Sequence, residues 1–422
     1  MYKIKSVPKL KNLSFKSINS QNIDSTALAI AREYINNYWQ NLIKFNPKDN
    51  GTLIGLPNPY LVPSSSAGRE FDFNEMFYWD SYFMVQGLYS KEQNSPLIHG
   101  ILDNLIFLFN KVDIIPNSNH YYMTSRSQPP FLTSYIFEVY ERYNHDSNWL
   151  KDRMEVAIKE YLTVWMGIAK PNARQVYKGL SRYYDYNYIN DIAEAESGWD
   201  MTPRFGRKAL NFLPIDLNSL LFKYEMDFSK YYKIINQESD SAKWLDLANK
   251  RRETVDQYMW NRYKGLYYDY DYVKKRRSNV ASLASFYPMW AGMVDAKRAD
   301  VLVKSLKTFI HRGGLSTTDS MPMSQIISSK TPLQWAYPNG WAPLQYIVIK
   351  GLKRYGYNDL AQDIALRWIK CNLNWFTKHQ IFLEKYNVVN TTRPPMRGLY
   401  PAQDGFGWTN SIFEALVEEF ID

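Results

Sequence analysis

The sequence predicts an all-α fold in which pairs of helices form a toroid, with long loops gathered at one mouth. Segments with helical spacing of apolar residues recur along the chain, and runs of alternating strands joined by hairpin turns are lacking. Every second connection between these segments is long and rich in Pro, Gly, Trp and Asn. Because long ordered loops tend to carry function, we expect a functional site at the mouth of the toroid.

The N-terminal part of the chain is expected to differ from the rest. Residues 1–23 are polar, basic and predicted to be irregular. From Asp24 onward apolar residues repeat at i, i+3, i+4 spacing, and either Asp24 or Ser25 is expected to cap this first helix. No Pro- and Ser-rich linker divides the chain after this point, so residues 24–422 are predicted to form a single domain.

The later elements follow from the same patterns. The clearest strand signal is a hairpin around Gly265, where Tyr267 to Tyr272 alternates. No repeat of fixed length is visible, which argues against a solenoid. Further helices are predicted at residues 75–89, 95–112, 130–144, 147–168, 214–235, 240–260, 297–312, 341–355, 358–377 and 407–421. The long loops are expected at residues 50–73, 113–129, 185–213, 314–340 and 384–406.

Composition and charge exclude several classes of protein. The single cysteine, Cys371, excludes a disulfide framework and a thiolate cluster, and the five histidines lack metal-site spacing, so we predict no metal site. The net charge is +9, but no recognisable nucleic-acid module accompanies the basic runs, such as residues 274–277, which we interpret as solvated surface. The apolar runs fit neither a membrane span nor a signal peptide, so a cytoplasmic location is expected. The oligomeric state is left open.

Five segments in or beside the long loops combine aromatic rings with carboxylates, amides or arginine. The chain is 16% aromatic, and most of these rings must belong to the core. Flat rings also pack against sugar faces, and bidentate polar groups bind hydroxyls, so these segments are typical of a carbohydrate site. They span residues 75–83, 125–131, 196–205, 334–345, and 381–387 together with 403–410.

A pair of carboxylates is the default catalytic set for such a site. Glycosidic cleavage needs a proton for the leaving oxygen and a second carboxylate that activates water or attacks carbon. The chain has neither a GxSxG elbow nor a P-loop. Asp200 is the best acid candidate, because Trp199 beside it could raise its pKa, although a helix N-cap explains the same context. Glu384 is the best base candidate, since it follows an apolar triplet, although an exposed Glu paired with Lys385 is the alternative.

Other polar residues near these segments have two interpretations each. Asp80, which lies between aromatic residues, either binds a sugar hydroxyl or belongs to a structural network. Arg126 and Arg204 either bind hydroxyls or a carboxylate of a ligand, or neutralise a buried acid. Three further carboxylates either tune Asp200 or face water: Asp191, Glu194 and Glu196.

Taken together, these segments resemble trehalases of glycoside hydrolase family 37 and, more loosely, family 63. The patterns YWDSYF, SRSQPPF, SGWD, QW-YPNGWAP-Q and EKY followed by QDGFGWTN occur in the order of that family, from about residue 75 to residue 410. The resemblance implies an (α/α)6 toroid, or six-hairpin barrel, as the catalytic domain of an inverting hydrolase. It implies Asp200 as the general acid and Glu384 as the general base, with no cofactor.

The resemblance also implies which residues contact the substrate, a small carbohydrate. The substrate contacts of the family correspond to Trp79, Asp80, Asn117, Arg126, Ser127, Gln128 and Gly198. We add the aromatic and amide residues of the same motifs: Trp199, Trp335, Trp341, Gln345 and Trp408. The expected reaction is hydrolysis of trehalose or of a closely related small α-glucoside.

Three departures from the family pattern concern groups that would hold the substrate. The family has a Gly-Arg-Phe-Arg-Glu run where residues 72–75 read Asp-Phe-Asn-Glu, so both arginines are missing, although Arg69 is nearby. An Arg-Pro-Glu segment before SGWD has no clear match. Leu399 stands where the family has Glu, and an unmet sugar hydroxyl there would cost about 1–3 kcal/mol. We therefore expect the glycone side to be kept and the leaving-group side to be rebuilt.

Two alternatives stay open at this point. The compact family 63 hydrolases that act on glucosylglycerate or mannosylglycerate are also similar, and a cation such as Arg69, Arg126 or Arg397 could meet the glycerate carboxylate. A non-catalytic sugar-binding protein on the same fold is the other alternative. The missing Arg and Glu groups favour it, whereas intact Asp200 and Glu384 argue against it.

Overall fold

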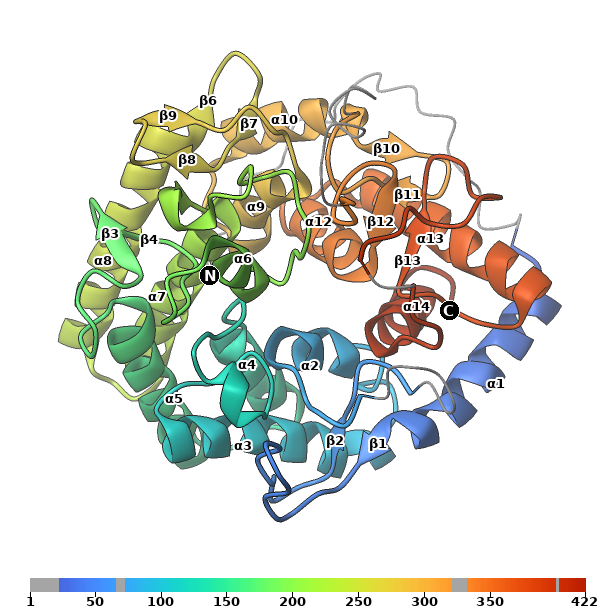
Figure 1. Ribbon diagram of the computed structural model, residues 1–422, viewed down its shortest axis with the longest axis horizontal. Helices are drawn as coiled ribbons and strands as arrows, with labels where there is room; N and C mark the ends of the chain where they lie inside the picture. Colours follow the sequence, from blue (N-terminus) through green and yellow to red (C-terminus); the bar gives the residue numbers. More distant parts are fainter. Residues whose placement is uncertain (1–22, 66–72, 321–331, 400–401) are drawn as a thin grey trace.

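The computed structural model describes residues 23–65, 73–320, 332–399 and 402–422. Its principal helices form two concentric rings (Figure 1). The inner ring contains α2 (Tyr78–Val85), α4 (Leu132–Arg142), α7 (Ile215–Ile234), α9 (Tyr287–Ala291), α12 (Ala342–Arg354) and α14 (Gly407–Phe420). The outer ring contains α1 (Ser25–Leu42), α3 (Ser95–Val112), α5 (Ser147–Glu160), α8 (Glu238–Met259), α10 (Ala296–Ser305) and α13 (Asn358–His379).

Each outer helix precedes an inner helix along the chain, so helix pairs follow one another around the ring (Figure 1). Neighbouring inner helices pack together, for example α7 on α9 and α9 on α12. Contacts between α14 and α2 close the circle. The predicted (α/α)6 toroid is confirmed.

The helices of the two rings differ in how much of their surface is buried. All eight residues of α2 are buried, and α7 is buried around most of its circumference. Outer helices bury one stripe only: α8 spans 22 residues, of which the buried ones are Ser241, Ala248, Arg251, Val255 and Met259. An apolar surface all round suits a helix enclosed by others, whereas a single stripe suits one that faces water.

Side-chain caps fix where several outer helices begin. The Asp24 carboxylate accepts the backbone N–H groups of Thr26 and Ala27, which identifies Asp24 rather than Ser25 as the cap of α1. Asp146 and Asp295 cap α5 and α10 in the same way.

The strands are short and antiparallel. They are β1 (Ile43–Lys44), β2 (Tyr60–Leu61), β3 (Gln175–Tyr177), β4 (Leu180–Ser181), β5 (Phe212–Leu213), β6 (Trp260–Asn261), β7 (Leu266–Tyr267), β8 (Tyr270–Asp271), β9 (Arg276–Arg277), β10 (Ile310–His311), β11 (Gly314–Leu315), β12 (Asn339–Trp341) and β13 (Lys385–Asn387). Strands β6 and β7 form the hairpin predicted around Gly265, whose φ is 64°. Tyr267 to Tyr272 is not one strand, because β8 pairs with β5 and β9 instead.

Several parts of the fold differ from the prediction. The helix predicted for residues 297–312 ends as α10 at Ser305 and is followed by strand β10. Helix α6 (Asn190–Glu196) lies inside the stretch 185–213 that we predicted as a loop, and α9 was not predicted. The helix predicted for residues 147–168 ends as α5 at Glu160 and continues as a π-helical turn over Tyr161–Trp165.

Arg69 and most of the N-terminal segment lie outside the described residues. Across the described ranges, none of the helices combines the length and apolarity of a membrane span.

Candidate active site

A cavity of about 440 Å³ lies among the loops that were predicted to form the mouth. Helix α2 supplies part of its wall, and the rest comes from the segments near residues 63, 73–77, 117–128, 195–200, 335–341, 384 and 403–408. Both predicted catalytic carboxylates, Asp200 and Glu384, line this cavity. The predicted binding residues that line it are Trp79, Asp80, Asn117, Arg126, Gln128, Gly198, Trp335, Trp341 and Trp408.

Asp200 sits in a tight turn that follows α6. Gly198 and Met201 on either side of it have φ values of 72° and 58°. No α-helix begins after Asp200 before α7, so the alternative interpretation as a helix N-cap is wrong. The backbone N–H of Thr202 donates to Glu194 Oε1 at 3.2 Å, which ties the turn to α6. The turn therefore presents Asp200 to the cavity.

The surroundings of Asp200 favour its protonated form. Burial raises the pKa of Asp200 to about 6, Arg126 opposes the rise, and the charge of Glu384 adds to it. Asp200 and Glu384 therefore interact across the cavity that both of them line. A carboxyl with this pKa keeps a usable proton in mildly acidic solution, as a general acid requires.

Glu384 immediately precedes β13 and is only 3% exposed. Its backbone N–H donates to Gln403 O at 2.9 Å, and its carbonyl accepts from Trp408 Nε1 at 3.1 Å. Its Oε2 lies 2.6 Å from Lys385 Nζ. The pairing with Lys385 that we gave as an alternative is present, but both groups are buried and Glu384 also lines the cavity.

The buried Lys385 is held by groups that belong to the wall of the site. Its Nζ also donates to Gln334 Oε1 at 3.0 Å. Pairing of β12 with β13 places Trp341 opposite Lys385, whose Nζ lies 4.7 Å from the ring centre. Trp341 stacks on Trp335 at 3.8 Å between ring centres. The aromatic wall and the cation beside Glu384 therefore form one packed unit.

Asp80 is a further carboxyl group of the cavity and lies in the first turn of α2. Burial raises the pKa of Asp80 to about 8, and the charges of Asp200 and Glu384 add to the rise. Burial therefore favours the protonated form of Asp80, which can donate a hydrogen bond. Gln128 links this helix to the neighbouring loop, because its Oε1 accepts the backbone N–H of Trp79 at 3.0 Å.

The two candidate arginines have different positions. Arg126 lines the cavity, with Nη1 3.7 Å from Asp185 Oδ2 and with Nε buried without a hydrogen-bond partner among the described residues. Arg204 lies outside the cavity lining and forms bidentate pairs with Asp216 and Asp269, at distances between 2.7 and 3.0 Å. Arg204 therefore neutralises buried acids, which was one of the two interpretations.

Three residues that we predicted to contact substrate do not line the cavity: Ser127, Trp199 and Gln345. Each of them contacts other parts of the protein instead. Ser127 Oγ donates to Ile115 O at 2.6 Å. Gln345 bonds both backbone groups of Leu315 at 2.8 Å. Trp199 is fully buried behind Trp335, with their ring centres 5.4 Å apart. All three support the wall from behind.

The carboxylates before Asp200 have three different roles. Glu196 is fully buried and accepts the backbone N–H groups of Ser127 and Tyr184 as well as the guanidinium of Arg174. Burial raises the pKa of Glu194 to about 8, and the charge of Asp200 adds to that rise. Asp191 forms an exposed pair with Arg207. Glu194 therefore interacts with Asp200, whereas Asp191 faces water.

Sequence reasoning missed part of the cavity lining. Glu75 and Phe77 belong to the first aromatic segment, so their position in that motif could have identified them. Gln403 and Phe406 belong to the segment 403–410, so the same signal applies to them. The other residues carry no comparable signal: Pro63, Phe73, Tyr122, Met123 and Ala195. Leu399 lies outside the lining and is 73% exposed.

Gly198 has little room for a side chain, which gives a test of the wall. A Cβ at this position would lie 2.5 Å from Trp79 Cε2, and its φ of 72° already disfavours other residues. We expect Gly198→Ala to displace Trp79 and to lower kcat/KM for cleavage of a small α-glucoside about tenfold or more. Small misplacements of groups in an active site reduce the rate strongly. Gly179→Ala is the control, because φ there is 81° but nothing lies within 4 Å. Equal, small effects of both variants would contradict the role of Gly198 in placing Trp79.

Comparison with known proteins agrees with this geometry. The family model described as Trehalase matches residues 5–197 and 183–420. Periplasmic trehalase from Escherichia coli O1:K1 / APEC is 32% identical, over 90% of this chain and 72% of that protein. The structure of neutral trehalase Nth1 from Saccharomyces cerevisiae matches with a TM-score of 0.75 and 29% identity, covering 93% of this chain and 80% of that chain.

A more distant structural match concerns the fold alone. The mannosylglycerate hydrolase of glycoside hydrolase family 63 from Thermus thermophilus has a TM-score of 0.65 at 15% identity, over 91% of this chain and 99% of that chain. The family of this chain follows from the extent of the family match and from the identity to the Escherichia coli enzyme. This chain belongs to the trehalase family of glycosidases.

Proposed function

We propose that this protein hydrolyses α,α-trehalose to two molecules of glucose with inversion at the attacked carbon. The observation that carries the proposal is the placement of Asp200 and Glu384 on one cavity with different electrostatic surroundings. Asp200 has a raised pKa, whereas Glu384 has a lysine ammonium on one oxygen. Two carboxyl groups in different surroundings on one cavity are what an acid and base pair needs.

In the proposed reaction, Asp200 donates its proton to the glycosidic oxygen as the bond to the anomeric carbon breaks. Glu384 accepts a proton from a water molecule that attacks the same carbon from the opposite face. Lys385 Nζ donates to Glu384 Oε2 at 2.6 Å and thereby holds the carboxyl group in place. Inverting enzymes separate the two carboxyl groups by about 6.5–9.5 Å, which leaves room for the water.

The remaining lining residues would hold the sugar and shield the reaction from solvent. Trp79, Trp335 and Trp341 offer buried apolar faces. A protonated Asp80 can donate to a sugar hydroxyl, and Arg126 offers a guanidinium. Burial of these polar groups strengthens their interactions with charge that develops during bond cleavage.

Glucose release by the purified protein tests the proposal. We expect release from trehalose, with NMR showing the newly formed anomer in the β form before mutarotation. Glucosylglycerate and mannosylglycerate serve as comparison substrates, whose cleavage is followed as release of glucose and of mannose, respectively. Faster cleavage of either glycerate compound would reject trehalose as the substrate, and binding of trehalose without release of glucose would reject catalysis.

The pH dependence of kcat/KM should reveal the acid. Because burial raises the pKa of Asp200 to about 6, the protonated fraction of the free enzyme falls as the pH rises through that value. We expect kcat/KM for trehalose to decrease above a pH of about 6, approaching tenfold per pH unit on the alkaline limb. Initial rates of glucose release in buffers of constant ionic strength measure this profile. A plateau that extends beyond a pH of about 8 would assign the proton donor to another group.

A further inference from the structure

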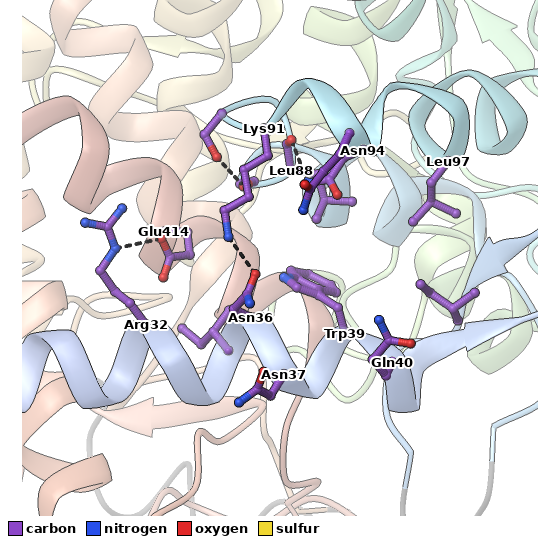
Figure 2. A pocket seen from close by; sticks show the side chains of 15 residues that line it. Arg32, Asn36, Asn37, Trp39, Gln40, Leu88, Lys91, Asn94, Leu97 and Glu414 are labelled. Carbon is purple, nitrogen blue, oxygen red and sulfur yellow. Dashed lines mark hydrogen bonds and ion pairs between the residues drawn. The ribbon is translucent and has the colours of Figure 1, made fainter.

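We propose that a second pocket, between the outer helix α1 and the inner helix α14, binds a neutral saccharide without cleaving it. It lies between α1, the segment that leads from α2 into α3, and α14 (Figure 2). Its volume of about 430 Å³ is close to that of the catalytic cavity, and the two cavities share no lining residue. A pocket of this size falls within the range of small-molecule sites.

The first argument is an aromatic ring that a sugar can cover. Trp39 on α1 is half-buried, and its ring projects into the pocket (Figure 2). The apolar wall continues beside it with Ile35, Ile43, Leu88 and Leu97. A half-exposed indole next to aliphatic side chains offers a flat surface to the C–H face of a pyranose ring.

The second argument is the concentration of carboxamide groups around this wall. The amide side chains that line the pocket are Asn36, Asn37, Gln40, Gln93 and Asn94. A carboxamide both donates and accepts hydrogen bonds, as does a sugar hydroxyl. Such groups can therefore bind hydroxyls in either orientation, next to a ring that covers the apolar face.

Two of these amides are already held in place from one side. Asn36 Oδ1 accepts from Lys91 Nζ at 2.6 Å, and Asn94 Nδ2 donates to Leu88 O at 3.0 Å (Figure 2). Within the described part of the chain, Asn36 Nδ2 and Asn94 Oδ1 have no protein partner. An amide fixed by one group and open at the other loses less side-chain entropy when a ligand binds.

The charges of the pocket favour a neutral ligand over an anion. Arg32 is paired with Glu414 at 3.1 Å and with Asp422 at 3.0 Å, and these two carboxylates balance in number the charges of Arg32 and Lys91, whose Nζ donates to Asn36. An anion would have to compete with these contacts. An apolar ligand would remove water from five amides without replacing its hydrogen bonds, which is costly. A polyhydroxylated neutral molecule does not compete with the charged contacts, and its hydroxyl groups replace the hydrogen bonds of the displaced water.

Fluorine NMR of protein labelled with 5-fluorotryptophan tests this pocket directly. Trp39→Phe assigns the Trp39 signal. Glucose, maltose and trehalose are titrated into the full chain, and trehalose is also titrated into Glu384→Gln protein so that the sugar stays intact. We expect a saturable shift of the Trp39 signal with at least one sugar. Asn36→Ala should weaken this binding about three- to tenfold, whereas Asn41→Ala, an exposed amide of α1 outside the pocket, should not change it.

The readout does not depend on turnover, so it separates this proposal from the proposed catalytic function. A Trp39 signal that none of the sugars shifts would overturn the proposal, whatever the glucose assay shows. Equal binding by wild-type and Asn36→Ala protein would also overturn it. Tighter binding of glucose 6-phosphate than of glucose at Trp39 would show an anion site instead and would reject the neutral ligand.

Discussion

Asp200→Asn and Glu384→Gln should each reduce trehalose turnover by at least about 10²-fold, the usual scale for general acid and base groups. Both amides keep the size of the original side chain but cannot transfer the proton. Asp200→Asn removes the proton that the leaving oxygen needs, and Glu384→Gln removes the acceptor for the proton of water. Glucose release at a pH near 6, where Asp200 is half protonated, gives kcat and KM for each variant over a range of trehalose concentrations.

The matched control is Asp191→Asn in the same segment as Asp200. Asp191 forms an exposed pair with Arg207 and does not line the cavity, so its variant should keep wild-type kcat within about twofold. Thermal unfolding of all three variants checks that they are folded. If Asp200→Asn or Glu384→Gln retained a tenth or more of wild-type kcat, the role proposed for that residue would be wrong.

The long helices of this fold could be predicted, whereas the short ones could not. Helix α3 has the bounds 95–112 that periodicity predicted, since its apolar stripe runs through several turns and Pro96 marks its start. Helices α6 and α9 have seven and five residues, too few for a helical period to appear. Their helical state depends on packing, which local sequence does not encode.

The motifs marked the right segments but not the direction of every side chain in them. Asp200 and Trp199 are adjacent, yet the first lines the cavity and the second stacks behind Trp335. The backbone angles of the turn decide this, and Gly198 signalled only that a turn was present. The acids that partner Arg204 are 12 and 65 residues away, at Asp216 and Asp269, so no local pattern pairs them.

Replacing Arg204 should have the largest effect on stability. Its guanidinium is fully buried, pairs with Asp216 and Asp269, and lies 4.4 Å from the ring centre of Trp199. Arg204→Met keeps an apolar side chain of similar length but leaves two buried carboxyls without a cation. We expect the free energy of unfolding to fall by about 3–5 kcal/mol, as when one partner of a buried ion pair is removed. Urea unfolding at neutral pH followed by circular dichroism measures the loss.

Arg207→Met provides the contrast, because Arg207 lies three positions further along the same loop and its ion pair with Asp191 is exposed. This variant should change the free energy of unfolding by no more than about 0.5 kcal/mol. A small loss in Arg204→Met, of the same size as in Arg207→Met, would show that the buried carboxyls do not depend on the guanidinium.

The pH dependence of the Arg204→Met loss adds a second criterion. Burial already raises the pKa of Asp269 in the folded protein, and Arg204 opposes that rise. Without Arg204 the pKa of Asp269 in the folded protein lies further above its pKa in the unfolded chain. The loss of stability therefore grows as the pH rises above the pKa of the unfolded chain, and it shrinks in acid. A loss that stays constant from mildly acidic to mildly alkaline pH would attribute the effect to packing against Trp199 rather than to the buried charges.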